Sequence, residues 1–139
     1  MKLEIKRIYL PNGNEKNEYC TYQKQLKPRR DFANSELEEL FNSHELEIMK
    51  IVEKEISEYV NSDDVCNDDV DFFPRRCVLT GEWYVSDICF SQKDCLSIMT
   101  AFLGIDLGYK DDYLGLEVLL TYDEDSASFI FDTINSESL

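Results

Sequence analysis

The feature that most constrains the fold is a long stretch of helical periodicity between residues 35 and 60. Its apolar side chains and the only histidine recur every three or four positions, whereas charged residues fill the other faces. The stripe comprises Leu37, Phe41, His44, Ile48, Val52, Ile56 and Tyr59. This pattern is typical of an amphipathic helix that buries one face. We therefore expect a helix of about residues 35–60 that begins with the capping box Ser35-x-x-Glu38. Asn42-Ser43 is the place where it could be split, because both residues favour caps over helix interiors.

A shorter stripe predicts a second helix, of about residues 91–103. Its apolar positions are Cys95, Ile98, Met99 and Phe102. Ser91-x-x-Asp94 precedes them like an N-terminal capping pair, and Gly104 follows as a usual helix stop. We expect these four side chains to form the buried face of that helix.

The rest of the chain predicts three β-hairpins. The first joins strands of about 2–10 and 17–25 through Asn12-Gly13, a two-residue turn signal. The second joins Cys77-Val78-Leu79 to Trp83-Tyr84-Val85 through Thr80-Gly81-Glu82, and the third joins 116–122 to 128–132 through 123–126. We therefore expect an α+β fold of order ββ-α-ββ-α-ββ, with antiparallel hairpins in a sheet and two helices packed on it.

The charge is distributed unevenly over what we expect to be a single domain, residues 1–139. The chain carries 14 Lys and Arg against 29 Asp and Glu, a net charge of −15. Residues 1–30 hold 8 basic and 3 acidic side chains, whereas residues 31–139 hold 6 basic and 26 acidic ones. Thirty residues are too few for a core of their own, so the expectation is a basic N-terminal hairpin, about 1–30, attached to an acidic remainder.

The length of the apolar runs and the number of cysteines indicate the cellular compartment. The longest apolar runs are far shorter than the roughly 18 residues that a membrane span needs, and residues 1–7 lack the apolar segment of a signal peptide. The cysteines are odd in number, five, which favours reduced thiols over a disulfide framework. These features predict a cytoplasmic protein, in a bacterium or in the host cytoplasm if a phage encodes it.

No spacing of candidate ligands points to a metal or a cofactor. Zinc sites usually hold closely spaced cysteine pairs, and Cys20, Cys66, Cys77, Cys89 and Cys95 are too far apart. The aspartates of 61–71 lack the central glycine of a calcium loop, and Gly104-x3-Gly108 follows a predicted helix rather than preceding one, unlike a phosphate-binding loop. We expect no cofactor and no metal.

Two features remain as candidate chemistry. His44 is the only imidazole available to a mechanism, but it lies on the apolar stripe with no cysteine near it in sequence, so we expect a structural histidine and no enzyme. We expect Arg29-Arg30 and Arg75-Arg76 to form ion pairs with the surplus acids; the alternative is that they converge and bind a phosphate.

The acidity is therefore the main functional signal. An excess of negative charge opposes binding to nucleic acid or to anionic membranes, and it favours a basic protein partner. The carboxylates that we expect to contact that partner cluster in 61–71, around 111–112 and in 123–125. They are Asp63, Asp64, Asp68, Asp69, Asp71, Asp111, Asp112, Asp123, Glu124 and Asp125. With spaced aromatics such as Trp83 and Tyr122, such a surface could imitate the phosphates of a nucleic acid.

In size, acidity and lack of catalytic motifs, the chain resembles immunity proteins that neutralise bacterial toxins and phage proteins that block host defence nucleases. The resemblance implies an inhibitor that occludes a positively charged partner, such as a nuclease toxin or a defence nuclease. The alternative expectation is a non-catalytic accessory or scaffold domain whose acidic surface only keeps it soluble.

Overall fold

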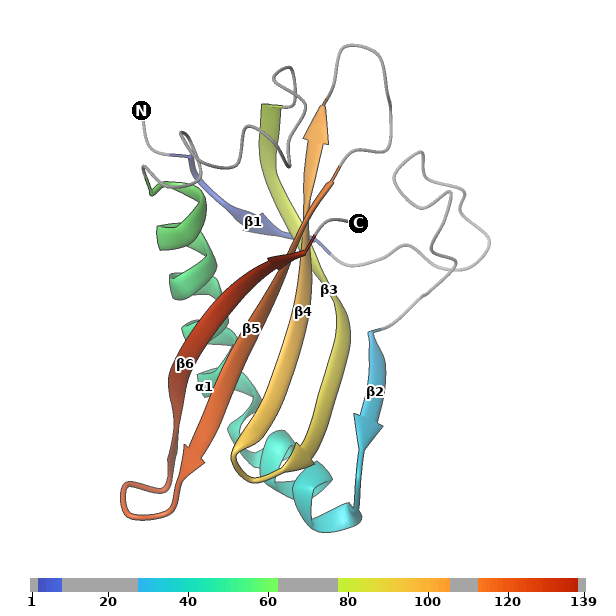
Figure 1. The fold of residues 1–139 in the computed structure, drawn as a ribbon, viewed down its shortest axis with the longest axis vertical. Helices are drawn as coiled ribbons and strands as arrows, with labels where there is room; N and C mark the ends of the chain where they lie inside the picture. The colour runs from blue at the N-terminus through green and yellow to red at the C-terminus, as the bar shows by residue number, and fades with distance from the viewer. Residues whose placement is uncertain (1–2, 9–27, 63–77, 106–112, 138–139) are drawn as a thin grey trace.

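The computed structural model describes residues 3–8, 28–62, 78–105 and 113–137, which form one helix and one curled sheet (Figure 1). The helix is α1 (Ser35–Val60). The strands are β1 (Lys6–Arg7), β2 (Arg29–Phe32), β3 (Val78–Gln92), β4 (Cys95–Ile105), β5 (Tyr113–Asp123) and β6 (Ser128–Glu137). No helix in these segments is both long and apolar enough to cross a membrane.

Helix α1 confirms the prediction from periodicity, with a different cap. Asn34, not Ser35, is the N-cap, and its side-chain oxygen accepts a hydrogen bond of 2.9 Å from the Leu37 backbone N–H. The helix continues through Asn42-Ser43. The Ser43 hydroxyl donates to the carbonyl oxygen of Glu39, one turn earlier, and so does not cap a new helix. The buried stripe matches the expected one: Leu37, Phe41, Ile48, Val52 and Ile56 are buried, and Tyr59 is partly buried.

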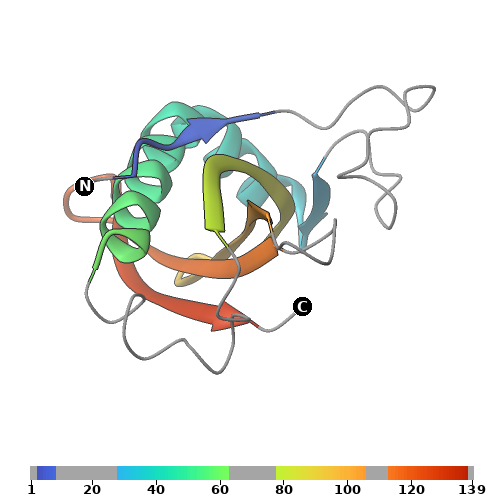
Figure 2. The same ribbon diagram turned by 90° about the horizontal axis from the view of Figure 1, so that it is seen from above.

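The sheet is mixed, in the order β1-β3-β4-β5-β6, with β2 also pairing with β3. Strands β3 to β6 form an antiparallel meander, whereas β1 and β2 run parallel to β3. Seen from above, the sheet curls from β1 round to β6, and α1 lies in the hollow between them (Figure 2). The sheet therefore has a concave face against α1 and a convex face turned away from it.

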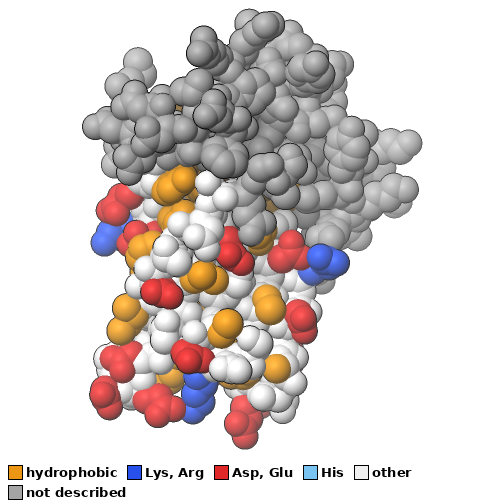
Figure 3. All heavy atoms as spheres, in the orientation of Figure 1, with side chains coloured by type: hydrophobic (Ala, Val, Ile, Leu, Met, Phe, Trp, Pro, Cys, Tyr) orange, Lys and Arg blue, Asp and Glu red, His pale blue; other side chains and the backbone are white. Residues whose placement is uncertain are grey.

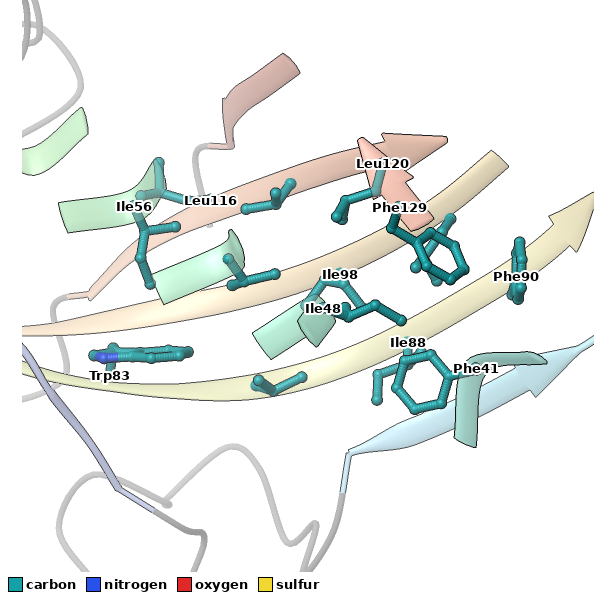
Figure 4. Packing of buried hydrophobic residues seen from close by; sticks show 14 of the residues in the cluster. Phe41, Ile48, Ile56, Trp83, Ile88, Phe90, Ile98, Leu116, Leu120 and Phe129 are labelled. Atoms are coloured by element: carbon teal, nitrogen blue, oxygen red, sulfur yellow. The ribbon is translucent and has the colours of Figure 1, made fainter. Parts of the chain in front are cut away.

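The core fills the concave face. Large side chains of β3 to β6 meet the buried stripe of α1 there (Figure 4). Trp83 stacks on Phe102 with ring centroids 6.3 Å apart. Fully buried core residues include Phe41, Ile48, Ile56, Ile88, Phe90, Leu96, Ile98, Leu116 and Val118. An apolar layer between the helix and the curled sheet thus makes up most of the core, and Tyr84 and Ala101 form a second, small buried cluster with Ile8.

The predicted order ββ-α-ββ-α-ββ with two helices is wrong, because the second predicted helix is strand β4. Lys93 and Asp94 form a two-residue turn after β3, and the chain then returns beside it. Leu96, Ile98 and Phe102 are completely buried, as is Thr100, whereas Cys95 is exposed. The burial therefore has the period of two that a strand requires, not the helical spacing that Cys95 and Met99 suggested.

The second predicted hairpin is also wrong, since β3 runs through Thr80-Gly81-Glu82 without turning. Gly81 takes a φ of +90°, and the pairing with β4 shifts register between Leu79 and Trp83. Glycine adopts this left-handed conformation without steric cost, so the predicted turn is a β-bulge instead.

The other two predicted hairpins differ in outcome. The third is confirmed, because β5 and β6 pair antiparallel across the turn at 124–127. In the first, the expected strand of 2–10 is represented by β1, which pairs in parallel with β3 rather than in a hairpin. Its expected partner strand, 17–25, lies outside the described residues.

Candidate protein-binding surface

Three of the ten acidic residues expected to contact a partner lie in the described part of the chain. They are Asp123, Glu124 and Asp125, at the turn between β5 and β6. The other seven, Asp63, Asp64, Asp68, Asp69, Asp71, Asp111 and Asp112, lie outside the described residues.

The β5–β6 turn uses two of its three carboxylates within the fold. The Asp123 carboxylate accepts a hydrogen bond of 2.8 Å from the Ser126 hydroxyl and a longer one of 3.3 Å from the Asp125 backbone N–H. Glu124 accepts a hydrogen bond of 2.7 Å from Lys93 Nζ in the β3–β4 turn, and this contact raises the pKa of Lys93. Only Asp125 leaves its carboxylate without such a partner among the described residues, so this turn is a weaker acidic site than its sequence suggests.

A larger acidic surface lies on α1, where the sequence analysis nominated no site. The helix carries eight glutamates and two lysines. Glu45 pairs with Arg30 at 3.5 Å. Five glutamates of α1 are exposed and form no ion pair with any other described residue. They are Glu36, Glu38, Glu39, Glu53 and Glu58. Leu46, which is 82% exposed, lies among them. We call these five glutamates and Leu46 the acidic helix surface.

The position of these glutamates along α1 shows which of them the fold uses. Glu36 and Glu38 lie in the first turn, where negative charge is favoured by the helix dipole. Glu53 and Glu58 lie toward the opposite end, where a positive charge is favoured, and the last turn holds no basic residue. Glu58 therefore opposes the helix dipole, and within the described segments neither it nor Glu53 is compensated by a salt bridge.

The arginine pair Arg29-Arg30 forms ion pairs with acids of this chain. Arg29 Nε donates to Asp87 at 2.9 Å. Arg30 pairs with Glu45 and also lies over the ring of Phe41, with 5.7 Å from its guanidinium carbon to the ring centroid. Both arginines therefore hold β2 against its neighbours; Arg75 and Arg76 lie outside the described residues.

His44 joins α1 to the β5–β6 turn. Its Nδ1 lies 2.9 Å from the carbonyl oxygen of Leu40, and its Nε2 lies 3.2 Å from that of Ala127. The rings of Tyr122 and Phe129 meet its imidazole edge-on, each with a centroid distance of 5.5 Å. Because both nitrogens face carbonyl oxygens, neither is directed at a nucleophile or a substrate, and the geometry is that of a structural histidine.

A shallow groove of about 450 Å³ runs over the convex face between β2 and β5. Glu117 lines it, and its carboxylate accepts hydrogen bonds from the Ser97 hydroxyl at 2.8 Å and the Asn135 side-chain amide at 3.3 Å. Cys89 lies in the same groove. Partial burial raises the pKa of the Cys89 thiol, and the charges of Asp31, Cys95 and Glu117 raise it further. Each of these effects disfavours the thiolate form, so they do not activate Cys89 as a nucleophile.

The described residues hold no group of three or more histidine, cysteine or acidic side chains that could bind a metal ion. In comparisons with protein-family models, curated proteins and solved structures, no match was found. Evidence for the function of this chain therefore comes from the geometry of its own surface.

Proposed function

We propose that this chain is an acidic binding protein that occupies a positively charged surface of another protein, without turnover. The proposed partner is a nuclease, either a bacterial toxin or a defence nuclease, so that the chain acts as an inhibitor of the toxin-immunity or phage anti-defence type. The observation that carries the proposal is the acidic helix surface, where five exposed carboxylates form no salt bridge with any other described residue and Leu46 is exposed.

The physical reason is electrostatic complementarity with an apolar contact at its centre. Carboxylates projecting from a rigid helix present negative charge at fixed spacings, as phosphates do along a nucleic acid. Such charges raise the association rate with a basic cleft, and they oppose the approach of acidic proteins. Leu46 supplies apolar area that becomes buried only when a partner covers it.

The test measures binding and inhibition of a panel of purified nuclease toxins and defence nucleases. The variant carries Glu39→Gln, Glu53→Gln and Glu58→Gln together. We expect its association rate with the inhibited nuclease at low salt to fall by about tenfold, with a flatter salt dependence, because exposed charges act mainly on encounter. Leu46→Ala should instead raise the dissociation rate, since a buried apolar contact is lost after encounter.

The matched control removes the same charge elsewhere on the surface. It carries Glu4→Gln, Asp31→Asn and Asp94→Asn, three exposed residues that are not part of α1. We expect a smaller loss of association rate in this control, because the contribution of a charge falls with its distance from the interface. If both triple variants bind and inhibit like the parent at every salt concentration, the acidity only keeps the protein soluble, and the accessory-domain alternative holds.

A further inference from the structure

The two sides of the sheet end differently. On one side, β3 is covered by β1 and β2, which pair with it in parallel. On the other side, β6 pairs with β5 from Asp123↔Ser128 to Gly115↔Glu137, and no other described strand pairs with it. An antiparallel strand at an edge leaves the N–H and C=O groups of alternate residues without a partner strand. Among the described residues, β6 is therefore the edge strand on this side of the sheet, and α1 is in contact with it (Figure 1).

This edge lacks most of the devices that keep edge strands from pairing. Proteins commonly protect an edge with proline, lysine, bulges or covering segments. The sequence of β6, SFIFDTINSE, contains no proline and no basic residue. It has one irregularity, a register shift that leaves Asp132 between the paired residues Phe131 and Thr133. Ile130, on the convex side, is 51% exposed, and Figure 3 shows apolar side chains scattered among acidic ones on this face.

The charges beside the edge indicate what kind of strand could be added there. Asp132 is exposed on β6 itself. Glu47 lies one turn after His44 on the same side of α1, and His44 contacts Ala127 just before β6. Both carboxylates are without a salt bridge among the described residues. A second copy of this chain would bring the same acids, and a further net charge of −15, to the same edge.

We propose that β6 receives an extended segment of a basic partner as an added antiparallel strand. This inference rests on the proposed function and names how that partner would be held. Backbone hydrogen bonds to β6 would supply affinity that does not depend on side chains. Alternate side chains of the added strand would face Ile130 on the convex side and the carboxylates of Glu47 and Asp132, so the segment should alternate apolar and basic residues.

The experiment uses the full chain and an eight-residue peptide of alternating lysine and valine as the probe. A second peptide has the same sequence with an N-methyl group on every residue, which removes the backbone donors of both strand edges and keeps the charge. We expect the N-methylated peptide to bind at least about tenfold more weakly, because it cannot complete the strand ladder. Hydrogen exchange should slow at alternate amides of β6 with the first peptide only.

A variant pair tests the same edge from the side of the protein. Ile130→Lys with Thr133→Lys places two positive charges on β6, and Asn42→Lys with Ser43→Lys places two on exposed positions of α1. We expect peptide affinity to fall at least about tenfold in the β6 variant and by less than about threefold in the α1 variant, because only the first charges adjoin the added strand. Melting curves verify that both variants are folded.

Three results would overturn the inference, and a fourth would overturn only the nuclease proposal. Equal binding of the two peptides would mean that charge alone attracts them. Self-association of the parent protein through β6, detected by ultracentrifugation and abolished by the β6 variant, would mean that a second copy occupies the edge. Nuclease inhibition that depends on the acidic helix surface and not on β6 would overturn this inference alone. Strand addition at β6 without inhibition of any nuclease would overturn the nuclease proposal alone.

Discussion

The two faces of the sheet are made by the same strands and have opposite characters. On the concave face, Ile98 and Val118 are completely buried under α1. On the convex face, their direct neighbours Met99 and Glu117 are partly exposed, and Glu117 is held by hydrogen bonds rather than by packing. The folding energy of these strands therefore comes mainly from one face, which leaves the other face and the open edge able to carry groups that serve binding.

The largest effect that would sharpen this comparison comes from adjacent residues of β4. Ile98→Ala should destabilise the protein by about 3 kcal/mol, because it removes buried methyl groups and leaves a cavity in the concave core. Met99→Ala, on the convex side, should cost less than about 1 kcal/mol, because little buried area is lost. Urea unfolding of the two variants provides the measurement. Equal losses would mean that the convex face is also packed.

A backbone change should have the next largest effect. Gly81 has a φ of +90°, and a methyl group there would collide with the carbonyl oxygen of Glu4. Gly81→Ala should therefore cost about 2 kcal/mol, from the strained conformation and the displaced N-terminal segment. A thermal melt gives the loss of stability. A melting temperature like that of the parent would show that β1 does not dock at this bulge.

Asn61 tests the link between α1 and the N-terminal segment. Its side chain accepts a hydrogen bond of 2.6 Å from the Leu3 N–H and donates to the carbonyl oxygens of Leu3, at 3.1 Å, and Ser57, at 2.9 Å. Asn61→Ala should cost about 1 kcal/mol, because these partly buried backbone groups lose their partner. Hydrogen exchange at Leu3 should become faster; unchanged protection there would contradict the assignment.

The smallest effect concerns reactivity on the convex face. The charge of Asp31 helps to raise the pKa of the Cys89 thiol, after the larger effect of burial. In a variant whose other cysteines are replaced by serine, Asp31→Asn should lower that pKa and increase the thiolate fraction. Alkylation near neutral pH should then be faster by roughly twofold, since exposed charges are screened by salt. An unchanged rate would show that the charge of Asp31 does not affect this thiol.

The success with α1 and the failure with β4 have one physical cause. Between residues 35 and 60 the apolar stripe continues for seven helical turns, and no strand pattern fits it. Between 95 and 102, the residues Ile98 and Phe102 fit a helical stripe and an alternating strand equally well. Leu96 and Thr100, both completely buried, distinguish the two patterns in favour of the strand. The β-branched side chains of Ile98 and Thr100 also favour a strand.

Parallel pairing of distant segments was beyond local pattern reading. Arg29 on β2 bonds to Asp87 on β3, 58 residues away, and no turn signal joins them. The sequence around Gly81 is ambiguous for a related reason, since a glycine needed for a bulge and one needed for a turn look alike in sequence.

The candidate site was predictable in character but not in position. Composition indicates an acidic surface. In the folded chain, however, the Asp123 carboxylate accepts a hydrogen bond from the Asp125 backbone N–H within the same turn. Glutamates such as Glu39 and Glu53, far apart in sequence, lie on one helix. Plotting charge as well as hydrophobicity on the helical wheel of 35–60 would have found this surface.

The pairing of β3 also has a kinetic consequence. The meander β3 to β6 closes short loops, whereas β1 and β2 reach β3 only after the chain closes much longer ones. Because loop-closure entropy opposes distant contacts, the meander forms the natural folding nucleus and the parallel strands add late. Substitutions at the Arg29–Asp87 pair should therefore speed unfolding with little effect on the refolding rate, and the nascent protein exposes the covered side of β3 until that last step.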